Sequence, residues 1–258
     1  SHTNANITGS TIEGNQAKQG AGVYLNDSPD VAEADCTGSH THNITGTEIN
    51  HNTASSLGGG MYVGTKSNVT LTGSTLEGNA STDKTGGQGG AIVAYGAGDI
   101  TLDSTTITNN DAAAGGGLFS LGVAVSDTHI TLRNNTKFTG NTAASGAGIY
   151  LVRSSGNNIL LELSDSAIDN NTASSSGGGI YAYGDTNRTS GNNTITLEGN
   201  TITYNTSKGT GGGIHLANAN QIMTSLNDTI EYNEAASYGG GVHVASGSEL
   251  LMNGGSIS

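Results

Sequence analysis

The chain is poor in the residues that fill a conventional protein core. Among its 258 residues there is no Trp, two Phe and one Pro, and only 33% of the residues are hydrophobic. A two-layer domain of this length needs more large apolar side chains than that, so the composition argues against one. A single cysteine, Cys36, excludes a disulfide framework within the chain. Stability therefore has to come from hydrogen bonding and from a thin, regular core.

Positive charge and long apolar runs are also scarce. Eight Lys and Arg stand against 21 Asp and Glu, which gives a formal net charge of −13. Such a chain repels phosphate backbones and anionic membrane surfaces, so we expect no nucleic-acid partner. No segment approaches the roughly 20 apolar residues of a membrane span, so we expect no membrane insertion by this chain.

What the chain has in abundance is Gly, with 42 copies, and a motif that recurs eight times. In each copy an apolar residue is followed three positions later by Asn, and then by a small-residue triplet that leads into an apolar-x-apolar run. The recurrent Asn residues are Asn15, Asn52, Asn79, Asn110, Asn141, Asn171, Asn205 and Asn233. The triplets begin at Gly20, Gly58, Gly89, Gly115, Gly146, Gly177, Gly211 and Gly239.

Each copy holds three short β-type runs, because a second apolar element usually precedes the motif by five positions. The repeat length is about 30 residues, too long for one hairpin and too short for a βαβ unit, and no segment shows a useful helical stripe. These features predict an all-β chain folded as a parallel β-helix, with about eight coils and three short strands per coil. We expect residues 1–258 to form a single β-helix domain, monomeric, cut from a larger surface protein.

The recurrent Asn and the Gly triplets have structural explanations within such a coil. Asn tolerates left-handed backbone at a turn, and its amide can either bond the backbone or stack on the Asn of a neighbouring coil. The Gly-rich triplets can supply positive φ and allow close backbone approach where the chain bends into the third strand. The Asn column is therefore predicted to be a structural ladder.

The paired signature resembles the repeats of the polymorphic outer membrane proteins of bacterial surfaces. It is carried by segments such as Phe138-Thr-Gly-Asn141 and Gly89-Gly-Ala-Ile92, with Ile, Leu and Gly-Gly-Gly variants in the other copies. The resemblance covers almost the whole chain. It implies a right-handed β-helix, like the pectate-lyase-like solenoids, displayed outside the cell or secreted, and commonly used in adhesion.

Rings line up in one outward position of the third strand. The residue between two inward apolar positions must point outward, because side chains alternate along a strand. Down the coils this column reads Tyr24, Tyr62, Val93, Phe119, Tyr150, Tyr181, His215 and His243. A ridge of rings could bind a glycan or a protein partner. Alternatively the rings only cover the sheet and stabilise one another.

Two connections between coils are long enough to carry specificity. Residues 26–43 hold a dense set of carboxylates that could bind Ca²⁺, namely Asp27, Asp30, Glu33 and Asp35. Cys36, His40 and His42 could instead offer ligands to Zn²⁺, although their spacing matches no established zinc pattern. A solvated acidic loop without metal is the third alternative.

The second long connection spans residues 183–193 and holds Asp185 and Arg188. Its polar side chains suit the rim of a binding surface.

An enzyme on this scaffold would need acids on adjacent coils. The best candidates are first-strand residues expected at comparable outward places in successive coils. They are Asp103, Arg133, Glu162 and Glu198. Mixed charges of this kind are also typical of a solvated solenoid face.

The favoured interpretation is a non-catalytic, adhesin-like surface protein that binds a glycan or a host or neighbouring-cell protein. A polysaccharide lyase or glycoside hydrolase is the second interpretation, and a passive stalk is the third. Fold alone does not separate the three, because the same solenoid carries all of them.

Overall fold

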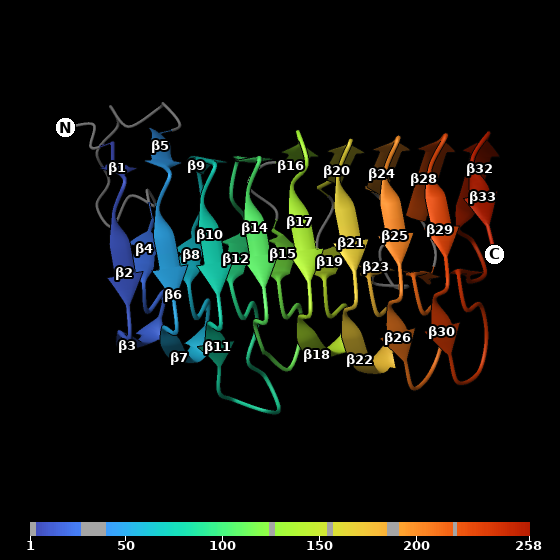
Figure 1. Ribbon diagram of the computed structural model, residues 1–258, viewed down its shortest axis with the longest axis horizontal. Helices are drawn as coiled ribbons and strands as arrows, with labels where there is room; N and C mark the ends of the chain where they lie inside the picture. The colour runs from blue at the N-terminus through green and yellow to red at the C-terminus, as the bar shows by residue number, and fades with distance from the viewer. Residues whose placement is uncertain (1–3, 27–39, 124–126, 154–156, 185–190, 219–220) are drawn as a thin grey trace.

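The structure, a computed structural model, describes residues 4–26, 40–123, 127–153, 157–184, 191–218 and 221–258. Within these ranges every regular element is a β-strand. The coils follow one another from the N-terminus to the C-terminus along a single rod (Figure 1). All strand pairs are parallel and join one coil to the next.

Three long sheets run along the rod. The first contains β1 (Asn6–Thr8), β5 (His40–Thr45), β9 (Ser67–Thr72), β13 (Asp99–Asp103), β16 (Thr128–Arg133), β20 (Ile159–Ser164), β24 (Asn193–Glu198), β28 (Gln221–Leu226) and β32 (Glu249–Asn253). The second contains β2 (Thr11–Glu13), β6 (Glu48–Asn50), β10 (Thr75–Glu77), β14 (Thr106–Thr108), β17 (Lys137–Thr139), β21 (Ala167–Asp169), β25 (Thr201–Thr203), β29 (Thr229–Glu231) and β33 (Ser256–Ile257). The third contains β4 (Val23–Leu25), β8 (Met61–Val63), β12 (Ile92–Tyr95), β15 (Leu118–Gly122), β19 (Ile149–Arg153), β23 (Ile180–Gly184), β27 (Ile214–Ala217) and β31 (Val242–Val244).

A fourth short strand between the recurrent Asn and the Gly triplet was not predicted. These corner strands form two small sheets along the lower edge of Figure 1. One contains β3 (Gln16–Gln19), β7 (Thr53–Leu57) and β11 (Ala80–Ser81); the other contains β18 (Thr142–Ser145), β22 (Thr172–Ser176), β26 (Thr206–Ser207) and β30 (Glu234–Ala235). Their inward residues are mostly Ala or Ser, so the sequence carries almost no apolar alternation to mark them.

The core is a thin column enclosed by the three long sheets. Its largest fully buried apolar side chains include Phe138, Ile44, Met61 and Leu102. Equivalent residues stack coil upon coil, as in Leu76 beside Ile107 and Ile107 beside Phe138. The predicted all-β parallel β-helix with coils of about 30 residues is therefore confirmed.

The recurrent Asn residues form the predicted ladder inside one corner. In each step the side-chain Nδ2 and the backbone N–H of one Asn both donate to the Oδ1 of the next, as from Asn110 to Asn141 at 3.0 Å in each bond. From Asn52 onward, each Nδ2 also donates to a backbone carbonyl of the preceding coil, as from Asn141 to Ile107 at 3.0 Å. These bonds satisfy buried donors and acceptors that would otherwise be costly.

The left-handed residue at this corner is not the Asn itself, as the sequence suggested, but the residue before it. That position has positive φ in all eight copies, where the residues are Gly14, His51, Gly78, Asn109, Gly140, Asn170, Tyr204 and Tyr232. The ladder Asn keeps an ordinary backbone because its amide must point inward along the rod. The first Gly of every triplet does adopt positive φ, as predicted, with values from 54° to 66°.

Candidate functional site

The aromatic column keeps the predicted register along the third sheet. Tyr24 pairs with Tyr62, and the pairing continues coil by coil to His243 without a slip. The rings contact one another directly. The centroids of Tyr24 and Tyr62 lie 4.9 Å apart with nearly parallel planes, and those of Tyr150 and Tyr181 lie 4.8 Å apart.

The column is not a uniformly exposed ridge. Tyr24 is 50% exposed at one end, but Tyr62 and Phe119 are 8% and 2% exposed, and Val93 is fully buried. These central residues form a second apolar cluster outside the main core, packed against Leu57 and other neighbours. Packing within the sheet therefore accounts for the centre of the column, as one of the two interpretations of the sequence expected.

Burial changes the chemistry of the tyrosines in the column. It raises the pKa of Tyr62 to about 12, with smaller contributions from Tyr24 and Tyr95. Burial also raises the pKa of Tyr150 and of Tyr181. The phenols thus stay neutral at physiological pH, and they can donate or accept hydrogen bonds.

A second outward column adjoins the first on the same sheet. It contains Tyr95, Leu121, Val152 and Tyr183, which are paired in register and half-buried. We call these four residues, together with Tyr150 and Tyr181, the outer face of the third sheet. This column was not predicted from the sequence. The signal that could have found it is an apolar or aromatic residue two positions after each member of the first column in these four coils.

The outward faces of the other two long sheets are mostly polar. On the first sheet Thr70, Thr101, Thr131, Glu162, Thr196 and Thr224 form one column, which ends in the exposed Leu251. Leu160 and Ile222 are further outward apolar residues of this sheet. On the second sheet the outward column runs through Glu13, Asn50, Glu77, Thr108, Thr139, Asp169, Thr203 and Glu231. Among the described strands, a column of outward aromatic rings is therefore specific to the third sheet.

The C-terminal end of the aromatic column consists of two histidines. The rings of His215 and His243 lie 4.6 Å apart, and His215 Nδ1 lies 3.0 Å from the Thr210 hydroxyl. Burial, and then the neighbouring His243, lower the pKa of His215 to about 4. His215 is therefore neutral at physiological pH, and its imidazole packs on Tyr181 as one more ring of the column.

Three of the four enzyme candidates share one outward register column, and Glu162 does not. Asp103 pairs with Arg133, and Glu198 lies further along the same column, where it pairs with Ser164. Glu162 pairs with Thr131 and therefore lies two residues upstream of the Asp103 position. The sequence contains this difference, since Glu162 precedes the inward Leu163, whereas Asp103 and Glu198 follow Leu102 and Leu197.

Asp103 and Arg133 form an ion pair. Arg133 Nε lies 2.9 Å from Asp103 Oδ2, and Asn134 Nδ2 donates to Asp103 Oδ1 at 3.0 Å. The hydrogen bond from Asn134 is the largest cause that lowers the pKa of Asp103, and Arg133 contributes to the same direction. A carboxylate held ionised in this way is unsuited to act as a general acid.

The calcium candidates Asp27, Asp30, Glu33 and Asp35 lie outside the described residues, as do Cys36, Asp185 and Arg188. His40 and His42 lie on β5, where His42 is buried and accepts a hydrogen bond from the backbone N–H of Ala5 at 3.1 Å. In the part of the chain that the structure describes, no three His, Cys, Asp or Glu side chains are grouped to hold a metal ion. Calcium binding thus stays a prediction. The described residues also contain no helix long and apolar enough to cross a membrane.

A second polar ladder lies at the corner between the first and second sheets, and the sequence analysis missed it. The backbone N–H of Thr47 donates to Ser74 Oγ, and that of Thr105 donates to Thr136 Oγ1. A hydroxyl, amide or carboxylate recurs two residues before the inward apolar residue of the second sheet, which is the signal that could have found it. Its members are Ser10, Thr47, Ser74, Thr105, Thr136, Ser166, Asn200 and Asp228.

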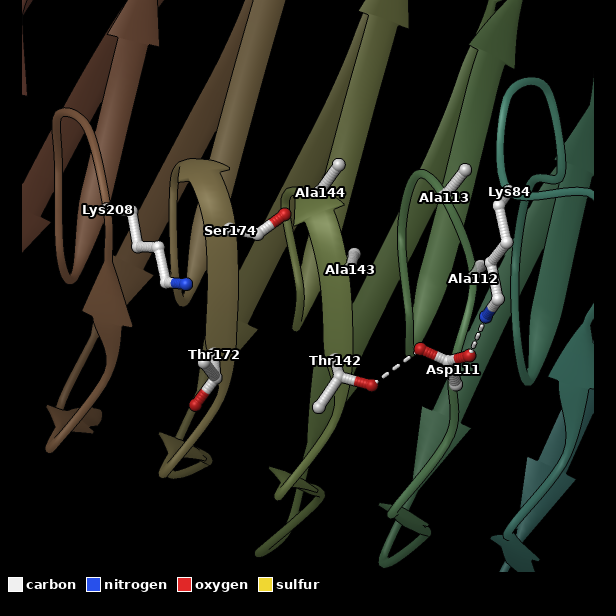
Figure 2. Close-up of a pocket in the computed structure, with 10 residues that line it drawn as sticks. All are labelled: Lys84, Asp111, Ala112, Ala113, Thr142, Ala143, Ala144, Thr172, Ser174 and Lys208. Atoms are coloured by element: carbon white, nitrogen blue, oxygen red, sulfur yellow. Dashed lines mark hydrogen bonds and ion pairs between the residues drawn. The ribbon is translucent and has the colours of Figure 1, made fainter.

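A groove lies over the corner strands, where the two small sheets are interrupted (Figure 2). Its volume is about 360 Å³. At one end Lys84 forms an ion pair with Asp111, and at the other end Lys208 extends over the groove. This groove could not be predicted from the sequence, because its residues come from five different coils. The groove is lined by Lys84, Asp111, Ala112, Ala113, Thr142, Ala143, Ala144, Thr172, Ser174 and Lys208.

The fold and its ladders define a repeat solenoid of the parallel β-helix class. A family described as right-handed β-helix region matches residues 1–187, and the chain belongs to that family. No curated protein and no solved structure matches the chain. The family establishes the architecture, whereas an adhesive, enzymatic or passive role has to be argued from this chain's own surface.

Proposed function

We propose that the chain is a non-catalytic, adhesin-like β-helix that binds another molecule through the outer face of the third sheet. The observation that carries the proposal is the contrast between this face and the other two. Three sheets of the same rod are built by the same repeat, but among the described strands only the third sheet carries aromatic rings in the outward positions of successive coils. A half-buried face rich in Tyr is the composition typical of protein interaction surfaces.

The ring geometry favours a protein partner over a glycan at this face. Sugars stack on the flat faces of aromatic rings, but here the rings of Tyr150 and Tyr181 lie against each other, with centroids 4.8 Å apart and planes tilted by 45°, so each ring covers part of its neighbour. Ring edges and phenol hydroxyls remain for the ligand, and these suit the mixed apolar and polar surface of a protein. We therefore propose a protein on a host or neighbouring cell as the partner, and a glycan as the alternative.

An extracellular location, at the cell surface or in secreted form, is part of the same proposal. The resemblance to bacterial surface repeats supports it. The alternative of a polysaccharide-degrading enzyme gains no support from the candidate residues, since Asp103 is held in an ion pair with Arg133 and Glu162 lies outside their register column.

The test is adhesion of beads coated with the purified chain to cultured cells. The double variant Tyr95→Ser/Tyr183→Ser is expected to reduce adhesion about 10-fold, because large aromatic side chains carry much of the binding energy of a protein interface. The matched control, Thr101→Ser/Thr196→Ser, changes two outward residues of the first sheet and is expected to adhere like the parent. Protease treatment of the cells should abolish adhesion, whereas periodate treatment would do so if the ligand were a glycan.

Two results would contradict the proposal. Equal adhesion of the parent and the tyrosine variant would show that the outer face of the third sheet does not take part in adhesion. Absence of adhesion by the parent to every cell type tried would favour the passive stalk.

A further inference from the structure

The groove over the corner strands arises from an irregularity in the repeat. The third copy has nine residues between Asn79 and Gly89, whereas the other copies have four or five. This extra chain forms the wall that bears Lys84, seen as the loop below β11 in Figure 1. Beside it, pairing between the small sheets is reduced to isolated bridges at Asp111 and Ala114. The groove is thus built at a defined place and is not a repeated feature of the rod.

The groove is rich in basic residues, although the chain as a whole is acidic. The molecule has a net charge of −13, yet two of its eight basic residues line this one groove. Lys84 is neutralised by its ion pair with Asp111. Lys208 is exposed, and among the described residues it forms no ion pair, so its ammonium group is free to bind an anion.

The rest of the lining combines methyl groups with hydroxyl groups. Ala113 and Ala144 present methyl groups, while Thr142, Thr172 and Ser174 present hydroxyls beside them. The Thr142 hydroxyl donates to Asp111 Oδ1 at 2.7 Å, and the Thr172 hydroxyl accepts from Thr206 at 3.3 Å. Such hydroxyls both donate and accept, which suits a ligand that carries hydroxyls of its own.

We propose that this groove binds a carboxylated sugar unit, with its carboxylate on Lys208, its hydroxyls on the Thr and Ser side chains and its C–H surface on the Ala methyl groups. A volume of about 360 Å³ suits a ligand of one or two sugar rings. The site lies on another face of the rod from the outer face of the third sheet, and the proposal does not depend on the protein partner proposed for that face.

An acidic peptide fits the groove less well. Extended peptides bind mainly through main-chain hydrogen bonds to a free strand edge. Here the floor strands pair along the rod, as Thr142 with Thr172 and Thr172 with Thr206, so their backbone groups are already used. A ligand recognised by side chains alone is favoured.

The test is a titration of the whole chain, followed by NMR, with methyl glucuronide and with methyl glucoside as its uncharged counterpart. The glucuronide is expected to bind, and Lys208→Gln is expected to weaken its binding about 10-fold, because a charge-assisted hydrogen bond is lost. Lys18→Gln removes the same charge from an exposed position on β3 outside the groove, and it should leave binding unchanged. Raising the salt concentration should weaken the interaction.

Two further variants sharpen the result. Ala144→Leu places an isobutyl group in the groove at an exposed position and should abolish binding without lowering the melting temperature. Asp111→Asn removes the carboxylate that neutralises Lys84 and should tighten binding. Four outcomes would each overturn the proposal. The glucoside and the glucuronide could bind equally well, or Lys208→Gln and Lys18→Gln could weaken binding by the same factor. A tetraglutamate peptide could bind more strongly than the glucuronide, or neither sugar could bind at all. None of these outcomes bears on adhesion through Tyr95 and Tyr183.

Discussion

The interior Asn ladder and the outward aromatic column run along the same rod in the same parallel register, but they differ in how strictly each position is specified. All eight ladder positions are Asn, whereas the column accepts Tyr, Val, Phe and His. Between the two ends of the ladder, each amide accepts two hydrogen bonds and donates two more, and no other side chain of that size provides both functions. The centre of the aromatic column has to cover the sheet, for which size and shape suffice.

The largest expected effect comes from breaking the ladder. Asn141→Ala leaves two donors of Asn110 without an acceptor, and it deprives the Ile107 carbonyl of its donor. Since each unsatisfied buried group costs about 1–3 kcal/mol, we expect a loss of about 4 kcal/mol in the free energy of unfolding. Urea denaturation measures this loss.

The control for the ladder is Asn43→Ala on β5. Its side chain is exposed and, among the residues that the structure describes, bonds only Asn6, at 3.1 Å, so we expect a loss below about 0.5 kcal/mol. Similar losses in the two variants would mean that the ladder bonds are not energetically special.

The next effect comes from the buried centre of the aromatic column. Phe119→Ala removes a ring that is 2% exposed and that meets Tyr150 edge to face at 5.4 Å, so we expect a loss of about 3 kcal/mol. Tyr24→Ala, at a residue that is 50% exposed, should cost less than about 1 kcal/mol. Thermal or urea unfolding measures both losses. Equal losses of stability in Phe119→Ala and Tyr24→Ala would mean that the whole column is an exposed ridge, as the alternation of side chains along the strand suggests when taken alone.

A smaller effect should depend on pH at the histidine end of the column. The pKa of His215 is about 4 in the folded chain against an ordinary value of 6.5, so the unfolded chain binds more protons between these values. Stability should therefore fall as the pH drops from about 6.5 towards 4 and level off below that. Allowing for partial screening by solvent, the loss is on the order of 2 kcal/mol.

The variant His215→Phe isolates this effect from the titration of other groups. It retains a ring in the column but cannot take up a proton, so its stability should decline less than that of the parent over the same pH range. Parallel pH profiles, measured by urea unfolding at each pH, would contradict the burial of a neutral imidazole.

The smallest effect is expected at the residue that precedes each ladder Asn. At this position the left-handed backbone conformation recurs in every copy, whereas the side chain varies. Tyr204 has a φ of 56° and is 53% exposed, and its ring stacks on Tyr232 at 5.2 Å. Tyr204→Asn should relieve strain in the left-handed region and lose one ring contact, so the net change should stay within about 0.5 kcal/mol. A melting curve shifted by 10 °C in either direction would show that this ring has a larger structural role.

Much of the architecture could be predicted from the sequence, because one coil contains nearly all the information needed to build the next. The spacing of Asn141 from Phe138 recurs in every copy, and so does the left-handed Gly that starts each triplet. The short corner strands escaped prediction because their inward Ala and Ser residues give weak alternation. The second ladder also escaped, although Thr105 and Thr136 stand at the same place in their copies.

The sequence by itself determined the coil, the ladder and the aromatic register, since these follow from patterns that lie within about 30 residues. Only the tertiary structure decided that Phe119 is covered while Tyr24 is exposed, and that Lys84 and Lys208 line one groove. These features depend on how connections of unequal length bring different coils into contact. Local periodicity fixes which way a side chain points, but burial and proximity are set by neighbours that lie one or more coils away in the chain.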